Sequence, residues 1–222
     1  FAWSVQMQMA SNLDRLDKTN DAVKQLRDMN ALRPSDPAPS IALGDILRSR
    51  ERHVEAIVAY DQALVKIKTP ENRHWSLFYA RGISLEQSKQ WPRAEGDFLK
   101  ALELNAEQPL VLNYLGYSWV DRGQNLERAQ KMIVKAVELR PSDGYIADSL
   151  GWVYYKVGKY ERAVKELDRA VELLPADPII NDHLGDAFWR VGRYREAKFQ
   201  WQRVLGLNPK PELEVQIKNK LK

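Results

Sequence analysis

From Leu115 to Pro209 the sequence repeats one pattern at a nearly constant interval. A Leu-Gly pair is followed by an aromatic residue three positions later, then by alanine, and then by proline. The glycines of three such pairs are Gly116, Gly151 and Gly185, which lie 35 and then 34 residues apart. A fixed period of this length is typical of proteins that stack one small structural unit many times. The sequence therefore predicts a repeat array, in which each unit is buried only by its neighbours.

The residues of the pattern predict a unit of two helices joined by a turn. Small side chains let helices approach closely, so we expect each glycine to face the alanine that follows it by 12 or 13 residues, on the next helix. Each proline falls where the second helix should end, because proline cannot continue a helix. Aromatic residues at the repeating positions are expected in the core. These are Phe98, Trp119, Tyr154, Phe188 and Trp201.

This spacing resembles the tetratricopeptide repeat (TPR), whose pattern also contains Leu-Gly, an aromatic residue, two small residues and a proline. The resemblance covers nearly the whole chain and is strongest from 75 to 209. It implies an all-α fold, a right-handed superhelical TPR solenoid of about six helix-turn-helix repeats with a C-terminal closing helix. The predicted segments are 1–36 (a degenerate first repeat), 37–74 (a second repeat with an insertion), 75–108 (third), 109–143 (fourth), 144–177 (fifth), 178–211 (sixth) and 212–222 (the closing helix).

Composition limits the class of protein. The 222 residues are 44% hydrophobic and 29% charged, which is typical of a folded chain. No apolar run approaches the roughly 18 residues of a membrane span, so no span is predicted. The formal net charge is +4, but Lys and Arg alternate with acidic residues as on solvated helix faces, and we predict no nucleic-acid binding. The chain begins at Phe1 without Met, so we expect a processed product or an excised fragment.

The motifs that would indicate catalysis are missing from the sequence. There is no cysteine, which excludes disulfides and thiolate chemistry. His53, His74 and His183 are far apart in the sequence and form no His-Glu-x-x-His pattern, and a metal site is not predicted. No Gly-rich phosphate loop or nucleophile elbow is present. We therefore predict no catalytic residues, no cofactor and no enzymatic activity.

In TPR-like arrays the first helix of each unit lines a concave face, and this implies where a partner would bind. The implied partner-binding residues are Asn113, Tyr117, Asp121, Asp148, Trp152, Tyr155, Asp182, Asp186 and Trp189. The set is rich in aromatic residues, which are favoured at binding hot spots, and in carboxylates. It predicts a peptide of basic or amide-rich character as the ligand, and it excludes a clamp for a terminal carboxylate, which Asp148 and Asp182 would repel.

A structural role for the same side chains stays open at this stage. The aromatic residues of the set could pack between repeats instead of contacting a ligand. The aspartates could cap helices or pair with neighbouring arginines. His183, next to Asp182, could also form a weak metal site or a pH-sensitive site, although a plain surface histidine is the simpler interpretation.

These observations predict a non-catalytic scaffold or adaptor that binds a peptide or partner protein in the concave groove. Two alternatives remain: a self-assembly module that forms homo-oligomers, or a regulatory domain of a longer protein that carries an enzyme elsewhere. The segments 113–117, 148–152 and 182–186 also resemble the carboxyl-terminal part of bacterial envelope TPR adaptors. This resemblance implies the periplasm or cell envelope of a Gram-negative bacterium, with an envelope protease or its substrates as partners.

Overall fold

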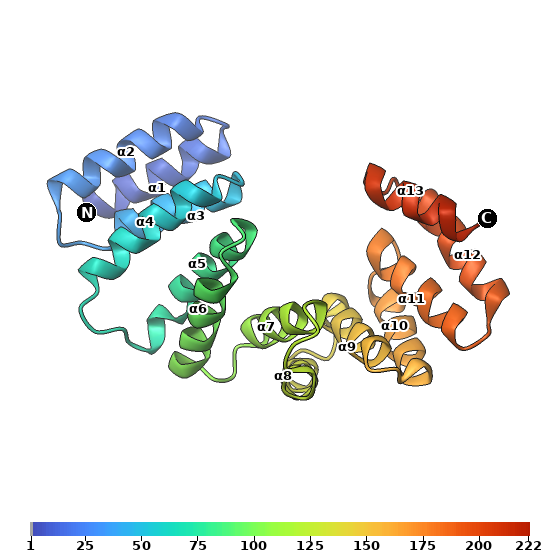
Figure 1. The fold of residues 1–222 in the computed structure, drawn as a ribbon. Coiled ribbons are helices and arrows are strands. Elements are labelled where there is room, and N and C mark those ends of the chain that lie inside the picture. Colours follow the sequence, from blue (N-terminus) through green and yellow to red (C-terminus); the bar gives the residue numbers. More distant parts are fainter. Residues whose placement is uncertain (1) are drawn as a thin grey trace. The chain divides into compact units, whose positions relative to one another are not determined.

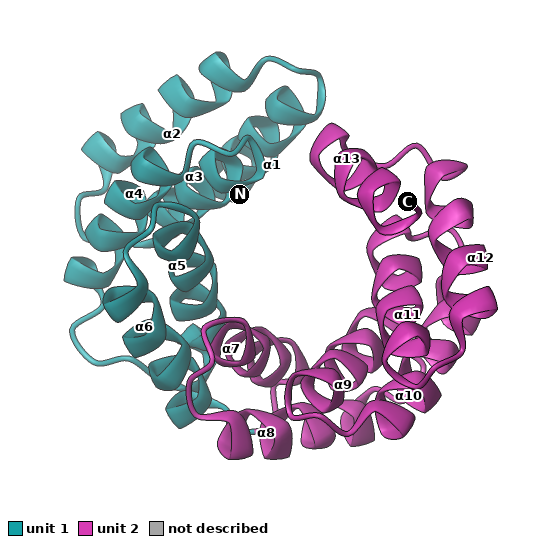
Figure 2. Cartoon of the chain, turned by 45° about the vertical axis from the view of Figure 1, so that its right-hand side comes forward, with its two compact units in different colours: residues 1–106 teal, residues 107–222 magenta. Residues whose placement is uncertain are grey.

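The computed structural model describes residues 2–222, and within them the secondary structure consists of α-helices and one 3₁₀ helix, without a strand (Figure 1). The all-α class that the sequence predicts is confirmed. The chain forms two compact units, unit 1 (residues 1–106) and unit 2 (residues 107–222), which are coloured separately in Figure 2.

The helices of both units are short and of similar length, as the repeat requires. Unit 1 contains α1 (Ala2–Arg15), α2 (Thr19–Leu32), α3 (Ala38–Ser49), α4 (His53–Lys66), the 3₁₀ helix η1 (Asn72–His74), α5 (Trp75–Gln87) and α6 (Trp91–Leu104). Unit 2 contains α7 (Pro109–Asp121), α8 (Leu126–Leu139), α9 (Gly144–Lys156), α10 (Tyr160–Leu173), α11 (Pro178–Arg190), α12 (Tyr194–Leu205) and α13 (Pro211–Lys220). The insertion predicted in the second repeat, residues 37–74, is found at its end, where η1 lengthens the connection before α5.

Consecutive helices pack as pairs, and each pair packs on the next pair of its unit. In unit 2, α7 packs on α8, α9 on α10 and α11 on α12, while α8 and α10 also contact the first helix of the following pair. The inner helices α7, α9, α11 and α13 form one layer, and the outer helices α8, α10 and α12 form the other (Figure 2). In unit 1, α3 contacts both α1 and α5, and these three helices pair with α4, α2 and α6 respectively.

Local sequence explains where the helices begin and turn. Pro178 occupies the first turn of α11, where its missing N–H leaves no bond unmade. The side chain of Asp177 precedes it and accepts hydrogen bonds from the backbone N–H groups of Ile179 and Ile180. Gly158 and Gly192 have φ angles of 78° and 79°, a left-handed conformation that glycine adopts without a steric cost and that lets α9–α10 and α11–α12 turn tightly.

The repeated glycine of each inner helix lies under a large side chain of its outer helix. A Cβ atom added to Gly44, Gly82, Gly116, Gly151 or Gly185 would lie 2.4–2.7 Å from the nearest atom of Tyr60, Phe98, Ile133, Leu167 or Trp201 respectively. The prediction that each glycine faces an alanine therefore needs a correction. The alanine is buried nearby, but the side chain one turn after it fills the space that the glycine leaves.

Most of the predicted core is confirmed, with one exception. Phe98, Trp119, Phe188 and Trp201 are at most 5% exposed. Tyr154 packs against the core as expected, but it is only partly buried and lies at the edge of the core.

The helix α13 closes unit 2. Ile217 is fully buried in the core that α9 to α12 form, and Leu213 of the same helix and Leu221, directly after it, pack against this core. The closing role predicted for this segment is thus met by one apolar side of α13. The exact limits of the individual repeats stay predictions, since the linkers between pairs belong to both neighbours.

We expect Gly151→Ala to lower the free energy of unfolding by about 1–3 kcal/mol, because the new methyl group would meet Leu167 inside a packed core. Gly96→Ala is the matched control, since nothing lies within 4 Å of a Cβ at this position in α6. Replacing this helical glycine should raise the free energy of unfolding by about 0.5–1 kcal/mol. Urea unfolding followed by circular dichroism measures both changes, and equal effects of the two substitutions would contradict the packing argument.

Candidate functional site

The predicted binding residues lie on one side of three consecutive inner helices of unit 2. Within each helix they are three or four positions apart, which places them on a common face. We call this surface the inner face of unit 2. Its members are Asn113, Tyr117 and Asp121 on α7, Asp148, Trp152 and Tyr155 on α9, and Asp182, Asp186 and Trp189 on α11.

Exposure divides these residues into three groups. Asp148 and Asp182 are buried, each with 7% of its surface exposed. Trp189 is 42% exposed and Asp121 is also exposed. The remaining members are half-buried, namely Asn113, Tyr117, Trp152, Tyr155 and Asp186. A partner could therefore reach Asp121 and Trp189 without any rearrangement, whereas Asp148 and Asp182 lie below the surface.

A buried histidine joins α9 to α11 at the centre of the inner face. Nδ1 of His183 lies 2.8 Å from Oδ1 of Asp148. The imidazole also stacks on Trp152, with centroids 4.1 Å apart and planes 15° apart, and Trp152 stacks on Tyr155 at 4.7 Å and 4°. Sequence reasoning left His183 out of the binding set. The signal it offered was an acidic neighbour, Asp182, while the residue it actually pairs with lies 35 positions away.

The surroundings raise the pKa values of two groups of the inner-face region, His183 on α11 and Tyr117 on α7. Burial by itself lowers the pKa of a histidine, because it disfavours the charged imidazolium. The carboxylate of Asp148, with smaller effects of Asp182 and Asp186, outweighs burial and holds the pKa of His183 above its ordinary value of 6.5. Burial, followed by the charges of Asp148 and Asp121, raises the pKa of Tyr117 to about 12. The Tyr117 hydroxyl therefore stays protonated and can donate a hydrogen bond.

The closing helix supplies a cation to the other two aspartates. Nζ of Lys220 donates to Oδ1 of Asp182 at 2.7 Å and to Oδ1 of Asp186 at 2.6 Å. The same ammonium lies 5.6 Å from the ring centroid of Trp201, a cation–π distance. Burial and the charge of Asp182 raise the pKa of Asp186, and Lys220 offsets part of this increase. Sequence reasoning missed Lys220, since nothing in the repeat pattern indicates that α13 reaches α11.

The acidic character that the sequence predicts for the inner face is thus largely compensated within unit 2. His183 pairs with Asp148, and Lys220 pairs with Asp182 and Asp186. The sequence left open whether these aspartates pair internally or contact a ligand. The structure shows internal pairs, formed by a histidine and a lysine instead of the expected arginines, and contact with a partner stays a prediction.

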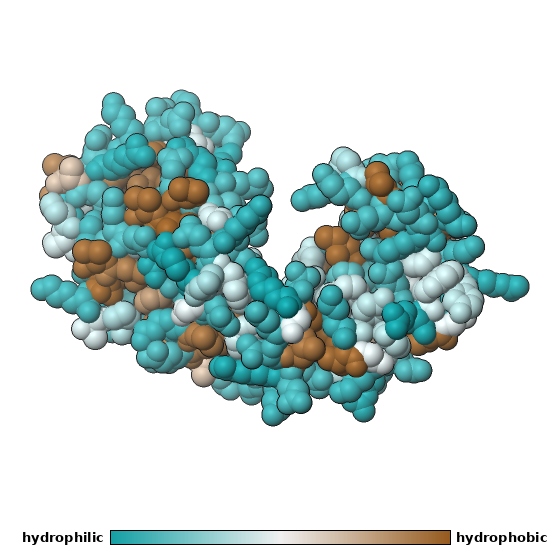
Figure 3. Space-filling model, in the orientation of Figure 1, coloured by the Kyte–Doolittle hydropathy of each residue, from teal (hydrophilic) through white to brown (hydrophobic). Residues whose placement is uncertain are grey.

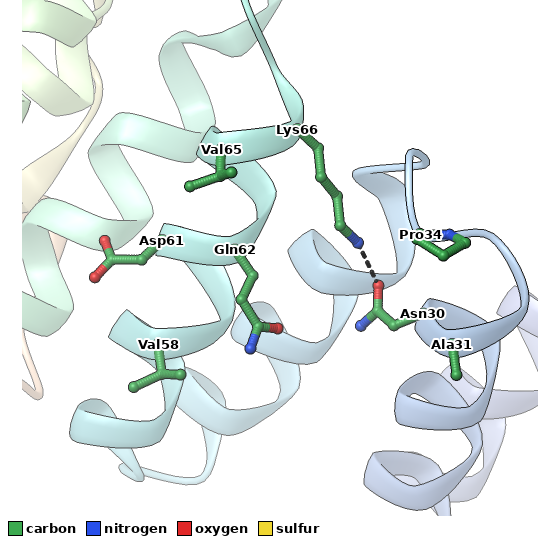
Figure 4. A pocket seen from close by; sticks show the side chains of 8 residues that line it. All are labelled: Asn30, Ala31, Pro34, Val58, Asp61, Gln62, Val65 and Lys66. Carbon is green, nitrogen blue, oxygen red and sulfur yellow. Dashed lines mark hydrogen bonds between the residues drawn. The ribbon is translucent and has the colours of Figure 1, made fainter.

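Unit 1 has a separate surface feature on its outer side. A groove of about 620 Å³ lies between α2 and α4 (Figure 4), and apolar patches are visible on the same unit in Figure 3. Val58 and Val65 line the groove and are 54% and 83% exposed. Nζ of Lys66 donates to Oδ1 of Asn30 at 2.8 Å and to Oγ of Ser40 at 3.0 Å, which ties α4 to α2 and α3. Lys66, Asn30 and Ser40 therefore hold neighbouring helices together, whereas the exposed side chains of Val58 and Val65 give the groove an apolar surface.

The part of the chain that the structure describes contains no group of three or more metal-ligating side chains placed to hold an ion. Among the helices of residues 2–222, none combines the length and the apolar composition needed to cross a membrane.

Comparison with known protein families identifies the same kind of repeat as the helix geometry. A tetratricopeptide repeat model matches residues 7–72, and a second TPR repeat model matches residues 151–192. The chain contains tetratricopeptide repeats and folds as a TPR solenoid. TPR proteins generally serve as scaffolds for protein–protein interaction, with stacked repeats that present an extended surface. The structure adds that, in this TPR protein, the repeated Leu-Gly pair lies on the inner helix of each pair in unit 2.

Similar proteins are known at the level of sequence and of structure. The TPR repeat-containing protein PA4667 of Pseudomonas aeruginosa is 33% identical over 84 residues, which are 38% of this TPR chain and 14% of the relative. The chain therefore spans a small part of that relative's length. YrrB, a TPR protein with an unusual peptide-binding site, is 20% identical with a TM-score of 0.64 over 87% of this chain and 97% of its own. A chain of the APC/C hetero-tetramer Cut9–Hcn1 is 17% identical with a TM-score of 0.79 over 98% of this chain and 42% of its own. The TM-scores of these two structures show that they share the fold of this chain.

The His183–Asp148 pair should make the stability of unit 2 depend on pH. Because the pKa of His183 is raised on folding, its contribution is fully present below pH 6.5 and is lost as the pH rises through the raised value. The thermal midpoint of the wild type should fall over this window. Asp148→Asn removes the charge that raises the pKa, so its midpoint should fall less, and NMR titration should give a lower pKa for His183. If the thermal midpoints of the wild type and of Asp148→Asn changed with pH in the same way, the pairing of His183 with Asp148 would be contradicted.

Lys220→Met should lower the free energy of unfolding by about 1–3 kcal/mol, because it leaves two largely buried carboxylates without their cation. Lys218→Met is the control on the same helix. The side chain of Lys218 is 60% exposed and pairs with Glu214 at the surface, so its loss should change stability by no more than about 0.5 kcal/mol. Thermal unfolding of both variants measures the difference, and comparable losses would show that Lys220 has no special role.

Proposed function

We propose that this TPR protein is a non-catalytic scaffold and that a peptide or partner protein binds the inner face of unit 2. The observation that carries the proposal is the exposure of Trp189. A tryptophan that is 42% exposed, on the same face as the exposed Asp121, has a large area to bury against a partner. Tryptophan is among the residues that dominate binding energy at protein interfaces.

The neighbours of Trp189 support this function because they hold it in place. Its ring lies 5.5 Å from Trp201 and meets Tyr194 edge-on at 4.5 Å. A pre-ordered aromatic side chain loses little conformational entropy on binding. On α7, the protonated hydroxyl of Tyr117 adds a hydrogen-bond donor to the same face. We therefore assign first contact to Asp121, Tyr117 and Trp189, with the paired aspartates beneath them as a supporting layer.

The cellular setting forms part of the proposal. Three short segments resemble bacterial envelope TPR adaptors, and a P. aeruginosa TPR protein shares part of the sequence. We accordingly assign the protein to the periplasm or cell envelope, with an envelope protease or its substrates as candidate partners. Cell fractionation of the source organism with an antibody against this chain tests the location.

Trp189→Ala combined with Asp121→Ala should reduce capture of the partner from a source-cell extract by about tenfold or more, because both side chains lie at the accessible part of the inner face. Helix content should stay unchanged, since both are exposed. Phe199→Ala is the control: Phe199 is 62% exposed on the outer helix α12, so its loss should leave capture unchanged. Quantitative mass spectrometry of captured proteins measures the effect.

Two results would contradict the binding face. Equal capture by the wild type and the double variant would place the partner elsewhere on the chain. No captured partner, with a molecular mass that rises with protein concentration, would favour self-assembly instead. A specific observation supports that second candidate: Val5 and Met9 of α1 and Leu16, directly after this helix, are 48%, 52% and 69% exposed. Static light scattering on the same samples distinguishes the two functions.

A further inference from the structure

Two consecutive turns of unit 2 carry the same chemical motif, which joins Tyr155 and Trp189 of the inner face to cations and tyrosines outside it. Residues 155–160 read Tyr-Lys-Val-Gly-Lys-Tyr, and residues 189–194 read Trp-Arg-Val-Gly-Arg-Tyr. In both, an aromatic residue and a cation precede the turn, and a cation and a tyrosine follow it. We call these two segments together the turn edge of unit 2. The corresponding stretch between α7 and α8, residues 120–126, has neither the aromatic residues nor the second cation.

The structure shows that the two segments also share a geometry. Tyr155 and Tyr160 meet edge-on, with centroids 5.5 Å apart and planes at 66°. Trp189 and Tyr194 meet in the same way at 4.5 Å and 62°. Each turn therefore builds one aromatic pair from the end of an inner helix and the start of an outer helix. Trp189 and Tyr194 are 42% and 54% exposed, so the second pair is open to a partner.

Arg190 connects the two aromatic pairs. Its guanidinium lies 4.3 Å from the ring centroid of Tyr160 and donates a hydrogen bond to the hydroxyl of that residue. It also lies 6.0 Å from the ring centroid of Tyr155. A guanidinium has five N–H donors, and the bond to Tyr160 uses one. The ring contacts hold Arg190 in place at an exposed position, which prepares it to pair with a carboxylate.

The exposed charge of this edge is positive. Lys156, Lys159, Arg190 and Arg193 are all exposed, and neither segment contains an acidic residue. One of these cations, Arg193, pairs with Glu196 at 2.9 Å. Asp148, Asp182 and Asp186 of the neighbouring inner face do not cancel the other cations, because His183 and Lys220 already pair with these three aspartates. The sequence predicted a basic ligand from the aspartates, but the internal pairing of these three leaves cations as the accessible charge of the turn edge, while Asp121 on α7 stays exposed.

We infer that the turn edge of unit 2 binds an acidic protein segment that carries apolar or aromatic side chains between its carboxylates. The inference rests on the proposed protein-binding function and specifies the chemistry of the partner. Carboxylates of the segment pair with Arg190, Lys156 and Lys159, and its apolar side chains pack on the aromatic pairs. A nucleic acid fits less well, because Glu161 and Glu196 lie next to the two segments and interrupt the uniform basic stripe that a phosphate backbone requires.

The test uses the full chain and three fluorescein-labelled probes: a peptide of alternating glutamate and leucine, its counterpart with lysine in place of glutamate, and an oligothymidylate. Fluorescence anisotropy measures binding at low and at moderate salt. The variant Lys156→Glu/Arg190→Glu removes two cations of the edge, and Lys159→Glu/Arg195→Glu removes one cation of the edge and the exposed cation next to it without touching the contact between Arg190 and Tyr160. The control Lys24→Glu/Lys68→Glu changes the net charge equally at exposed positions of unit 1.

We expect the wild type to prefer the glutamate peptide and each edge variant to bind it about tenfold more weakly, whereas the control changes affinity by less than about twofold. Preference for the lysine peptide, or an equal loss in the control, would overturn the inference. Tighter binding of oligothymidylate with the same dependence on the edge would overturn it in favour of nucleic acid. If extract partners are captured through Trp189 and Asp121 but the glutamate peptide does not bind, the scaffold function stands and this inference alone fails.

Discussion

The packing of a glycine under a large side chain is the contact on which the rest of each unit depends. Where the inner helix carries Gly151 or Gly185, its backbone approaches Leu167 or Trp201 of the outer helix more closely than any other residue would allow. This contact sets the distance between the two helices of a pair. Because it recurs in five pairs, it also brings equivalent positions of consecutive inner helices side by side, and those positions form the inner face.

The same contact explains why carboxylates of the inner face need internal partners. Asp45 and Asp186 each follow the repeated glycine by one residue, but Asp45 is exposed, whereas Asp186 is half-buried and burial raises its pKa. In unit 1 the Tyr60 hydroxyl donates to Asp45 at 2.8 Å, with Arg48 close by. In unit 2 the equivalent position of Tyr60 is Trp201, and Lys220 of the closing helix supplies the cation. A buried charge is tolerated only when it is paired.

Much of the architecture could be predicted because the signals are local and repeated. The period, the prolines at helix ends and the glycines at turns act within a few residues, and the helices follow them. The predictions that needed correction concern contacts between residues that are far apart in the sequence. Tyr154 occupies a repeating position but stays at the edge of the core, and the glycines meet large side chains instead of alanines. The position in the repeat indicates which side of a helix a residue occupies, but not how deeply a particular side chain is buried.

The sequence by itself determined the class of fold, the pairing of helices and the set of residues on the inner face, because hydrophobic periodicity and turn chemistry are properties of short segments. Only the tertiary structure decided which charges of that face remain accessible. Asp148 and His183 are 35 residues apart, and Asp182 and Lys220 are 38 residues apart, so their pairing depends on how successive helices stack. Charge compensation acts through space, and composition cannot show which carboxylates are neutralised and which cations face the solvent.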